Sequence, residues 1–162
     1  LFRKADTPPA AIESYPQALR TRCGAFVSIH NQGELRGCYG HMEEDKPLLQ
    51  NVREMAQWAA ARDSRFRPVT PEELNEVDIE ISVLSPLRKI QNITEIEMGV
   101  HGIFIRKGMN RGVFLPQVAT ETGWSKESFL GHCARDKAGI GWNGWKEAEI
   151  SVFTATIIRE NE

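Results

Sequence analysis

The stretch Val77-Asp78-Ile79-Glu80-Ile81-Ser82-Val83 decides the fold class of this chain. Apolar β-branched residues alternate with polar ones at a period of two, which is the pattern of a β-strand with one buried face. We therefore expect a strand over residues 77–85, in the interior of a largely antiparallel sheet. Ile79, Ile81 and Val83 should be buried, and Glu80 falls on the polar face.

The residues before this stretch predict a β-hairpin followed by a helix. Residues 23–30 are rich in strand formers, Asn31-Gln32-Gly33-Glu34 has the composition of a turn, and residues 35–39 should return as the second strand. From Pro47 to Asp63, apolar residues recur at helical spacing, so we expect a helix there, packed near the strand at 77–85. The prolines within residues 1–17 favour an extended arm.

The residues after it predict a second hairpin and more helices. Residues 103–106 and 113–115 flank a turn at 109–112, and helices are expected at 70–74 with a Thr70 cap, at 116–122 and at 125–137. Residues 149–159 close the chain as one strand. Because hairpins dominate and no strand-helix-strand unit repeats, the expected class is α+β, with a mostly antiparallel sheet flanked by helices.

Length and composition limit the function classes. The chain has 162 residues, 41% hydrophobic and 26% charged, which fits a single globular domain over residues 1–162. A net charge of −2 argues against a protein whose main role is binding nucleic-acid phosphates. No apolar run reaches the length of a membrane-spanning helix, and no signal peptide is recognised. Since the chain begins at Leu1 rather than at a methionine, we expect a trimmed chain or one domain of a longer protein.

The cysteines indicate the cellular environment. Cys23, Cys38 and Cys133 are odd in number and far apart in the sequence, which disfavours a disulfide-stapled secreted scaffold. A reducing cytoplasmic location is therefore expected.

The motif Leu35-Arg36-Gly37-Cys38-Tyr39-Gly40 carries the candidate chemistry. Gly37 and Gly40 lack a Cβ, so backbone amides and a ligand can approach the cysteine sulfur closely. Arg36 favours the thiolate, the form that attacks electrophiles and binds metals. Cys38 is thus a candidate nucleophile, redox thiol or metal ligand, and the alternative is a buried structural cysteine in a glycine-rich strand.

Four further residues are candidates for the same site. His41 can act as a base or orient a ligand, or can be a surface histidine in a turn. Asp63 and Arg65 can face a cleft or can fix the end of the preceding helix. Glu80 becomes a candidate catalytic carboxylate if its face of the strand is covered, and otherwise faces water.

Three other groups of residues give weaker signals. A metal site combining Cys38, His41 and Cys133 or His132 lacks the second paired ligand of a closed zinc site. A positive rim for an anionic ligand can be formed by five basic residues, Arg88, Lys89, Arg106, Lys107 and Arg111. An aromatic wall can be formed by three tryptophans, Trp124, Trp142 and Trp145. The sequence assigns no cofactor.

The chain resembles the AMMECR domain family, found from archaea to animals. The resemblance is carried by LRGCYG at residues 35–40, AAARDSRFRPVTPEEL at 59–74, EISVLSPLRKI at 80–90, HGIFIRKGMNRGVFLPQVATETGW at 101–124 and FLGHCARDKAGI at 129–140. Two positions depart from the family pattern. Tyr39 stands where isoleucine is usual and His41 where threonine is usual, so His41 adds a titratable group near the motif.

The resemblance implies an antiparallel sheet flanked by helices, with a smaller attached sub-domain and a cleft between them. It also implies partners, because similar domains belong to the AmmeMemoRadiSam system. That system includes a Memo-like protein, related to extradiol dioxygenases, and a radical S-adenosylmethionine protein, and some members are fused to the Memo-like domain.

Two functions follow as hypotheses. The first is an enzyme or enzyme subunit whose cleft holds Cys38, with Arg36 and Glu80, and acts on a small anionic or nucleotide-derived molecule. The second is a scaffold that docks the Memo-like or radical partner. RNA binding ranks below both, because the net charge is acidic and no aromatic ladder is visible.

Overall fold

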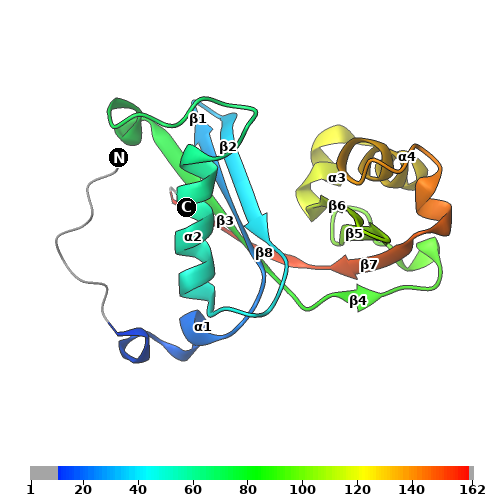
Figure 1. Ribbon diagram of the computed structural model, residues 1–162, viewed down its shortest axis with the longest axis horizontal. Helices are drawn as coiled ribbons and strands as arrows, with labels where there is room; N and C mark the ends of the chain where they lie inside the picture. Colours follow the sequence, from blue (N-terminus) through cyan, green and yellow to red (C-terminus); the bar gives the residue numbers. More distant parts are fainter. Residues whose placement is uncertain (1–10, 161–162) are drawn as a thin grey trace. The chain divides into compact units, whose positions relative to one another are not determined.

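The computed structural model describes residues 11–160 of the chain. The chain forms two compact units (Figure 1). Of the described residues, unit 1 comprises 11–84 and 156–160, and unit 2 comprises Ser85–Ala155. Most of the expected N-terminal arm lies outside the described residues, while Ile12–Ser14 form a 3₁₀ turn (η1) instead of extended chain.

Unit 1 is built on a four-stranded sheet in the order β2-β1-β3-β8. Its strands are β1 (Ala25–Asn31), β2 (Glu34–His41), β3 (Val77–Leu84) and β8 (Ala155–Arg159). β1 pairs antiparallel with both β2 and β3, so the expected antiparallel sheet and the interior position of β3 are confirmed.

The turn between β1 and β2 lies within the predicted segment, residues 31–34, and is a two-residue hairpin loop. Gln32 and Gly33 both have positive φ, at 52° and 83°, which is the type I′ pattern whose twist matches the strands on either side. The register shifts between Ile29 and His30, which face Gly37 and Leu35, so Arg36 is an extra residue on β2 and forms a β-bulge close to the turn.

Helix α2 (Leu48–Ala61) covers one face of this sheet, and the short helix α1 (Gln17–Arg20) packs against α2 (Figure 1). The helix predicted at 47–63 is thus confirmed. Because α2 packs mainly on β1 and β2, the β1 side chains Ala25, Val27 and Ile29 are at most 5% exposed.

The expected burial of Ile79, Ile81 and Val83 is wrong, because all three are only partly buried. They lie one strand farther from α2, opposite Ile29, Val27 and Ala25 respectively. The fully buried residues of β3 are Ser82 and Leu84, at 2% and 4% exposure. The alternation therefore located the strand but not the side chains that are buried most deeply.

The segment after α2 differs from its prediction. Thr70 does not cap a helix by its side chain, because the 3₁₀ turn η2 (Glu72–Asn75) begins after Pro71. The Glu73 carboxylate instead accepts a hydrogen bond from the Thr70 backbone amide at 2.8 Å.

Unit 2 has its own four-stranded sheet, in the order β4-β7-β5-β6, and all of its pairs are antiparallel. The strands are β4 (Arg88–Lys89), β5 (Gly102–Lys107), β6 (Asn110–Phe114) and β7 (Glu149–Phe153). The predicted second hairpin is confirmed, but its turn lies at Gly108 and Met109 rather than at 109–112. Gly108 has a φ of 59°, as the first position of a type II′ turn requires, so the strand resumes at Asn110.

Helices complete unit 2. α3 (Pro116–Thr122) is confirmed, and α4 (Lys126–His132) is capped by the Ser125 hydroxyl, which accepts from the Ser128 amide at 3.2 Å. The helix expected to continue to residue 137 changes instead to a π-helical turn, η4 (Cys133–Lys137). Two 3₁₀ turns, η3 (Ile93–Glu95) and η5 (Gly144–Glu147), complete the elements of the unit. The core includes Ile103, Ile105, Phe129 and Leu130, all with 0% exposure.

The strand predicted over residues 149–159 is two strands in two different sheets. β7 ends at Phe153 and β8 begins at Ala155, with Thr154 between them. The Ser85 amide donates to the Thr154 carbonyl at 2.9 Å, and the Thr154 amide donates to the Ser85 hydroxyl at 2.9 Å. These two bonds hold the point at which the chain changes sheets. The α+β class stands, with two antiparallel sheets flanked by helices.

Candidate functional site

Cys38 lies on β2, which forms one edge of the sheet in unit 1. Side chains alternate along a strand, and Tyr39 points to α2, where its ring meets Trp58 edge-on at 5.2 Å. Cys38 therefore faces the opposite side of the sheet. It is partly buried and forms no disulfide.

Cys38 is the first of four polar side chains that lie in a line across the sheet. The register places Cys38 opposite Ser28, and Ser28 opposite Glu80. The Ser28 hydroxyl donates a hydrogen bond to the Cys38 sulfur at 3.3 Å, and Arg159 of β8 donates to the Glu80 carboxylate at 2.9 Å. We call these four residues the polar row. Cys38 and Glu80 are two strand spacings apart, about 10 Å.

The sequence left open whether Glu80 is covered or faces water, and the structure shows a largely buried carboxylate. Its side chain is 14% exposed and paired with Arg159. Glu80 and Arg159 line a hollow of about 290 Å³ together with His30 and Asp78. Neither Ser28 nor Arg159 had been singled out from the sequence, since only the strand register brings them beside Cys38 and Glu80.

Asp63 holds the edge of β2 from the other side. Its carboxylate accepts the backbone N–H of Cys38 at 2.9 Å, and the Arg65 guanidinium at 2.9 and 2.6 Å. Hydrogen bonding by Arg65, followed by the amides of Cys38 and Arg65, outweighs burial and lowers the pKa of Asp63 to about 2. The ion pair fixes the segment after α2 to the strand that carries the thiol.

Arg36 is committed to partners other than the thiol. Its guanidinium forms a bidentate pair with Glu73 at 2.8 and 3.0 Å, and donates to the carbonyls of Arg67 and Pro68. Arg65 lies within electrostatic range of Cys38: the hydrogen bond to Asp63 is the main cause of the raised pKa of Arg65, and the charge of Cys38 adds to it. The stabilisation of the thiolate that was expected from Arg36 is therefore expected from Arg65, which lies 27 positions after Cys38.

The motif glycines have packing roles. A Cβ on Gly37 would lie 2.2 Å from the carbonyl oxygen of Ala59 in α2. A Cβ on Gly40 would lie 2.1 Å from the Phe26 ring. The space that Gly37 and Gly40 leave is thus occupied by protein atoms, and ligand binding at these two glycines stays a prediction.

His41 points to the opposite face of β2 from Cys38, because the two residues are three positions apart on one strand. Its ring nitrogens contact Glu43 at 3.2 Å and Asp45 at 2.7 Å. The hydrogen bond from His41 lowers the pKa of Asp45. A direct role of His41 beside the sulfur is therefore not supported by this geometry.

The three cysteines differ in their surroundings. Cys23 and Cys133 are buried, at 9% and 0% exposure. Burial raises the pKa of Cys23 and raises the pKa of Cys133 to about 12. In residues 11–160 no cluster of three His, Cys, Asp or Glu side chains could hold a metal ion.

A groove lies beside the edge of β2 in unit 1. It has a volume of about 830 Å³ and is lined by Arg36, Arg65, Phe66, Arg67, Pro68, Thr70 and Glu73. We call it the arginine groove. Arg36 and Arg65 had been predicted as ligand-binding residues, whereas Phe66 and Arg67 carried no separate signal beyond their place in the family motif.

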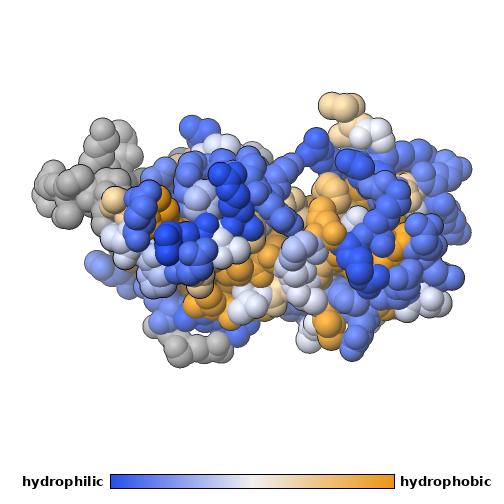
Figure 2. All heavy atoms as spheres, turned by 90° about the horizontal axis from the view of Figure 1, so that it is seen from below, coloured by the Kyte–Doolittle hydropathy of each residue, from blue (hydrophilic) through white to orange (hydrophobic). Residues whose placement is uncertain are grey.

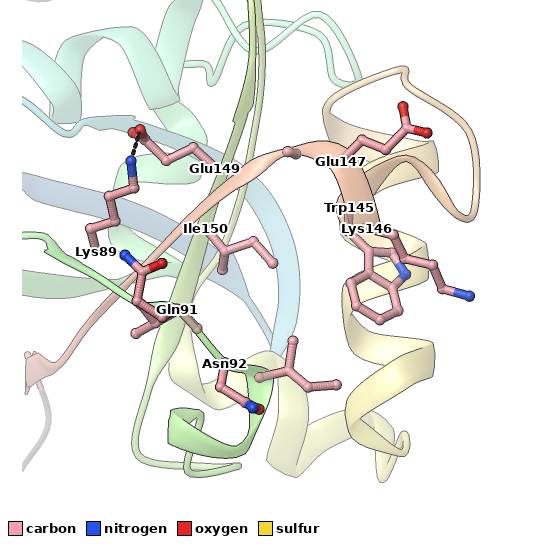
Figure 3. Close-up of a pocket in the computed structure, with 11 residues that line it drawn as sticks. Lys89, Gln91, Asn92, Trp145, Lys146, Glu147, Glu149 and Ile150 are labelled. Carbon is pink, nitrogen blue, oxygen red and sulfur yellow. Dashed lines mark hydrogen bonds and ion pairs between the residues drawn. The ribbon is translucent and has the colours of Figure 1, made fainter.

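Unit 2 contains a hollow of about 620 Å³, formed between β4, η5 and β7 (Figure 3). Figure 3 shows the Lys89–Glu149 ion pair on one side and Trp145 with Lys146 on the other. The basic residues expected to form a positive rim are largely neutralised. Arg88, Lys89, Arg106 and Lys107 each pair with a glutamate at 2.6–2.8 Å.

The tryptophans of unit 2 are divided between surface and core. Trp124 stacks on His132 with ring centroids 3.8 Å apart, and His132 meets Trp142 edge-on at 4.9 Å. Trp145 is buried in the core. The expected wall of three indoles is therefore a stack of two indoles about a histidine.

Within 11–160, every helix is too short or too polar to cross a bilayer.

The two sheets, their flanking helices and the motif on β2 define an α+β domain with a cysteine at a sheet edge. The profile of the AMMECR1 family matches residues 2–158, and the chain belongs to this family. The chain is 40% identical to a protein of Methanothermobacter thermautotrophicus over 157 residues, covering 92% of this chain and 81% of that one. It is 38% identical to protein MJ0810 of Methanocaldococcus jannaschii, covering 93% and 80% respectively.

A solved structure has the same fold. The crystal structure of the uncharacterised protein PH0010 from Pyrococcus horikoshii superposes with a TM-score of 0.87 at 32% identity. The match covers 95% of this chain and 80% of that chain.

Proposed function

We propose that this domain is an enzyme or enzyme subunit that uses the Cys38 thiol on a small anionic molecule. The observation that carries the proposal is the polar row. A partly buried sulfur accepts a hydrogen bond from a buried serine, and a paired carboxylate lies two strands away on the same face. A molecule lying across β1 would meet the thiol at one end and Glu80 with Arg159 at the other.

The surroundings of the sulfur support a functional thiol. A hydroxyl that donates to sulfur stabilises the thiolate relative to the thiol. Arg65 adds a positive charge within electrostatic range, although Asp63 neutralises part of it. Cys38 is also the least buried of the three cysteines, so reagents reach it first.

The pathway and location are part of the same proposal. We propose that the domain works with a Memo-like protein and a radical S-adenosylmethionine protein in a reducing cytoplasm, and the family resemblance supports this part of the proposal. These proteins would supply or consume the molecule that Cys38 acts on.

Alkylation of the native protein tests the proposal. At neutral pH, iodoacetamide should modify Cys38 before Cys23 or Cys133, because burial raises the pKa of the latter two. Mass spectrometry across a pH series locates the adduct and gives the apparent pKa of Cys38. Ser28→Ala should slow the reaction at fixed pH, whereas Ser151→Ala, which removes a buried hydroxyl from β7 in unit 2, should not. If Cys38 reacts only after denaturation, its role is structural.

The alternative is a scaffold that docks the partner proteins. Figure 2 shows a mostly hydrophilic face on which hydrophobic side chains gather in a few areas. Co-purification distinguishes the two functions. A scaffold would retain its Memo-like partner in a folded Cys38→Ser variant that has lost all thiol-dependent turnover.

A further inference from the structure

We propose that the arginine groove binds the phosphate group of a small organic phosphate monoester. The inference rests on the proposed function in one respect, because the phosphate monoester is taken to be the molecule that Cys38 acts on. Binding itself requires only the groove and not the thiol.

The charges of the groove favour an anion. Three guanidinium groups and the Glu73 carboxylate line it, and the Asp63 carboxylate binds Arg65 beside it, so one positive charge remains in excess. Arg36 is occupied by that carboxylate and by two backbone carbonyls. Arg67 differs, because its exposed guanidinium has no hydrogen-bond or ion-pair partner within residues 11–160. The planar fork of an arginine matches the oxygen spacing of a phosphate and binds it through two parallel hydrogen bonds.

Arg65 supplies a second cation. Its Nε and one terminal nitrogen bind Asp63, while the side chain remains 49% exposed. The ion pair with Asp63 holds Arg65 in place without covering it. A guanidinium already fixed by a carboxylate loses little conformational entropy when an anion arrives.

The backbone of the groove is also held. The Val69 amide donates to the Ala60 carbonyl at 2.7 Å, and the Phe66 amide donates to the Asp63 carbonyl at 3.1 Å. Together with the Arg36–Glu73 pair, these bonds tie residues 63–73 to both α2 and β2. The groove is therefore formed before a ligand binds.

The lining indicates a small organic ester rather than a bare ion. The groove measures about 830 Å³, whereas pockets for drug-sized ligands range over about 300–1,000 Å³. The Phe66 ring lies under the Arg65 guanidinium at 5.4 Å, and Pro68 adds a second apolar surface. A flat or apolar group attached to the phosphate can pack on these two side chains. A nucleic acid fits less well, because the chain as a whole carries a net charge of −2.

Calorimetric titration of the full chain with phenyl phosphate tests the inference. We expect saturable binding, competition by inorganic phosphate, and no binding of phenol, which lacks the phosphate. In Arg67→Gln the dissociation constant should rise about tenfold or more, the loss expected when hydrogen bonds from a charged group are removed. Arg67→Lys should restore the charge but not the two-pronged contact, and should give an intermediate value.

The matched control is Arg62→Gln. Arg62 is an exposed arginine that stacks on Trp58 at 5.1 Å and does not line the groove. The Arg62→Gln variant should bind phenyl phosphate with a dissociation constant within about twofold of that of the unsubstituted chain, as expected for a screened surface charge. Equal urea midpoints for the two variants would exclude a folding defect.

Three outcomes overturn the inference. The first is no saturable heat at about 10 mM phenyl phosphate. The second is unchanged binding in Arg67→Gln. The third is binding only of a single strand of about 20 nucleotides, which would indicate a nucleic-acid backbone instead. Cys38→Ser separates this inference from the thiol proposal, because it should bind phenyl phosphate normally even though it has no thiol to alkylate.

Discussion

At the scale of single residues, Asp63 holds the edge of the sheet in unit 1. The backbone N–H of Cys38 points away from β1 at this edge and would otherwise lack a partner. Asp63 accepts it together with the Arg65 side chain and the Arg65 amide. The carboxylate thereby protects the edge of β2 and places a cation near the thiol. A capping role and a site role, which the sequence left as alternatives, are compatible at this residue.

Asp63→Asn should destabilise the protein by about 2 kcal/mol at pH 7. The reason is linkage: the folded pKa of Asp63 is about 2 and the unfolded value about 3.8, so ionisation stabilises the folded state. This stability is fully present above the unfolded pKa and is lost as pH falls through the folded pKa. The difference between the two proteins should therefore persist to about pH 4 and shrink towards pH 2.

Urea unfolding at several pH values measures this difference. Glu34→Gln is the control, because Glu34 is an exposed acid on β2. It should change stability by less than about 0.5 kcal/mol at every pH. A difference between Asp63→Asn and the unsubstituted chain that does not change with pH would contradict the assignment of the carboxylate as the stabilising group.

At the scale of elements, β2 shows what sequence reasoning could and could not reach. The turn at Asn31–Glu34 and the helix after Pro47 were predictable, because turn chemistry and apolar periodicity are local signals. The partner of Arg36 was not predictable, since Glu73 lies 37 positions away in sequence. The glycines of the motif were noticed for ligand access, whereas the close approach of α2 and Phe26 that they permit depends on tertiary packing.

Gly37→Ala and Gly40→Ala should both destabilise the protein, but only the second should be rescued. The Cβ at residue 37 meets the Ala59 carbonyl, a backbone atom that no side-chain change removes. The Cβ at residue 40 meets the Phe26 ring. We expect each single substitution to cost about 1–3 kcal/mol, as overpacking does.

Double-mutant cycles followed by urea unfolding measure the rescue. In Gly40→Ala/Phe26→Ala the total loss should be smaller than the sum of the single losses, because the clash has gone. In Gly37→Ala/Ala59→Gly the losses should add, since the carbonyl oxygen remains. Rescue at residue 37 would mean that β2 and α2 are not held at the separation described here.

At the scale of the whole molecule, the chain builds two cores that the hydrophobic pattern alone did not separate. Residues 149–159 are rich in strand formers and contain no glycine or proline, so they predict one strand. The structure divides this segment at Thr154 between the sheets of unit 2 and unit 1. Periodicity reports which face of a strand is apolar but not which sheet the strand joins. The polar row was hidden for the same reason, because its four members come from four strands.

Cys23 and Cys133 are natural reporters of the two units. Each is buried in a different core, so neither should be alkylated until its own unit opens. Phe129→Ala removes a ring with 0% exposure from the core of unit 2 and should cost about 3–5 kcal/mol. Pulsed alkylation across a urea series should then show a lower midpoint for Cys133 and a smaller shift for Cys23.

The reciprocal variant completes the test. Met55→Ala empties a site with 1% exposure under α2 in unit 1, at a similar cost of about 2–5 kcal/mol. It should lower the Cys23 midpoint more than that of Cys133, because the lost contacts belong to unit 1. If both midpoints fall together in both variants, residues 1–162 unfold as one cooperative domain and the two cores are thermodynamically coupled.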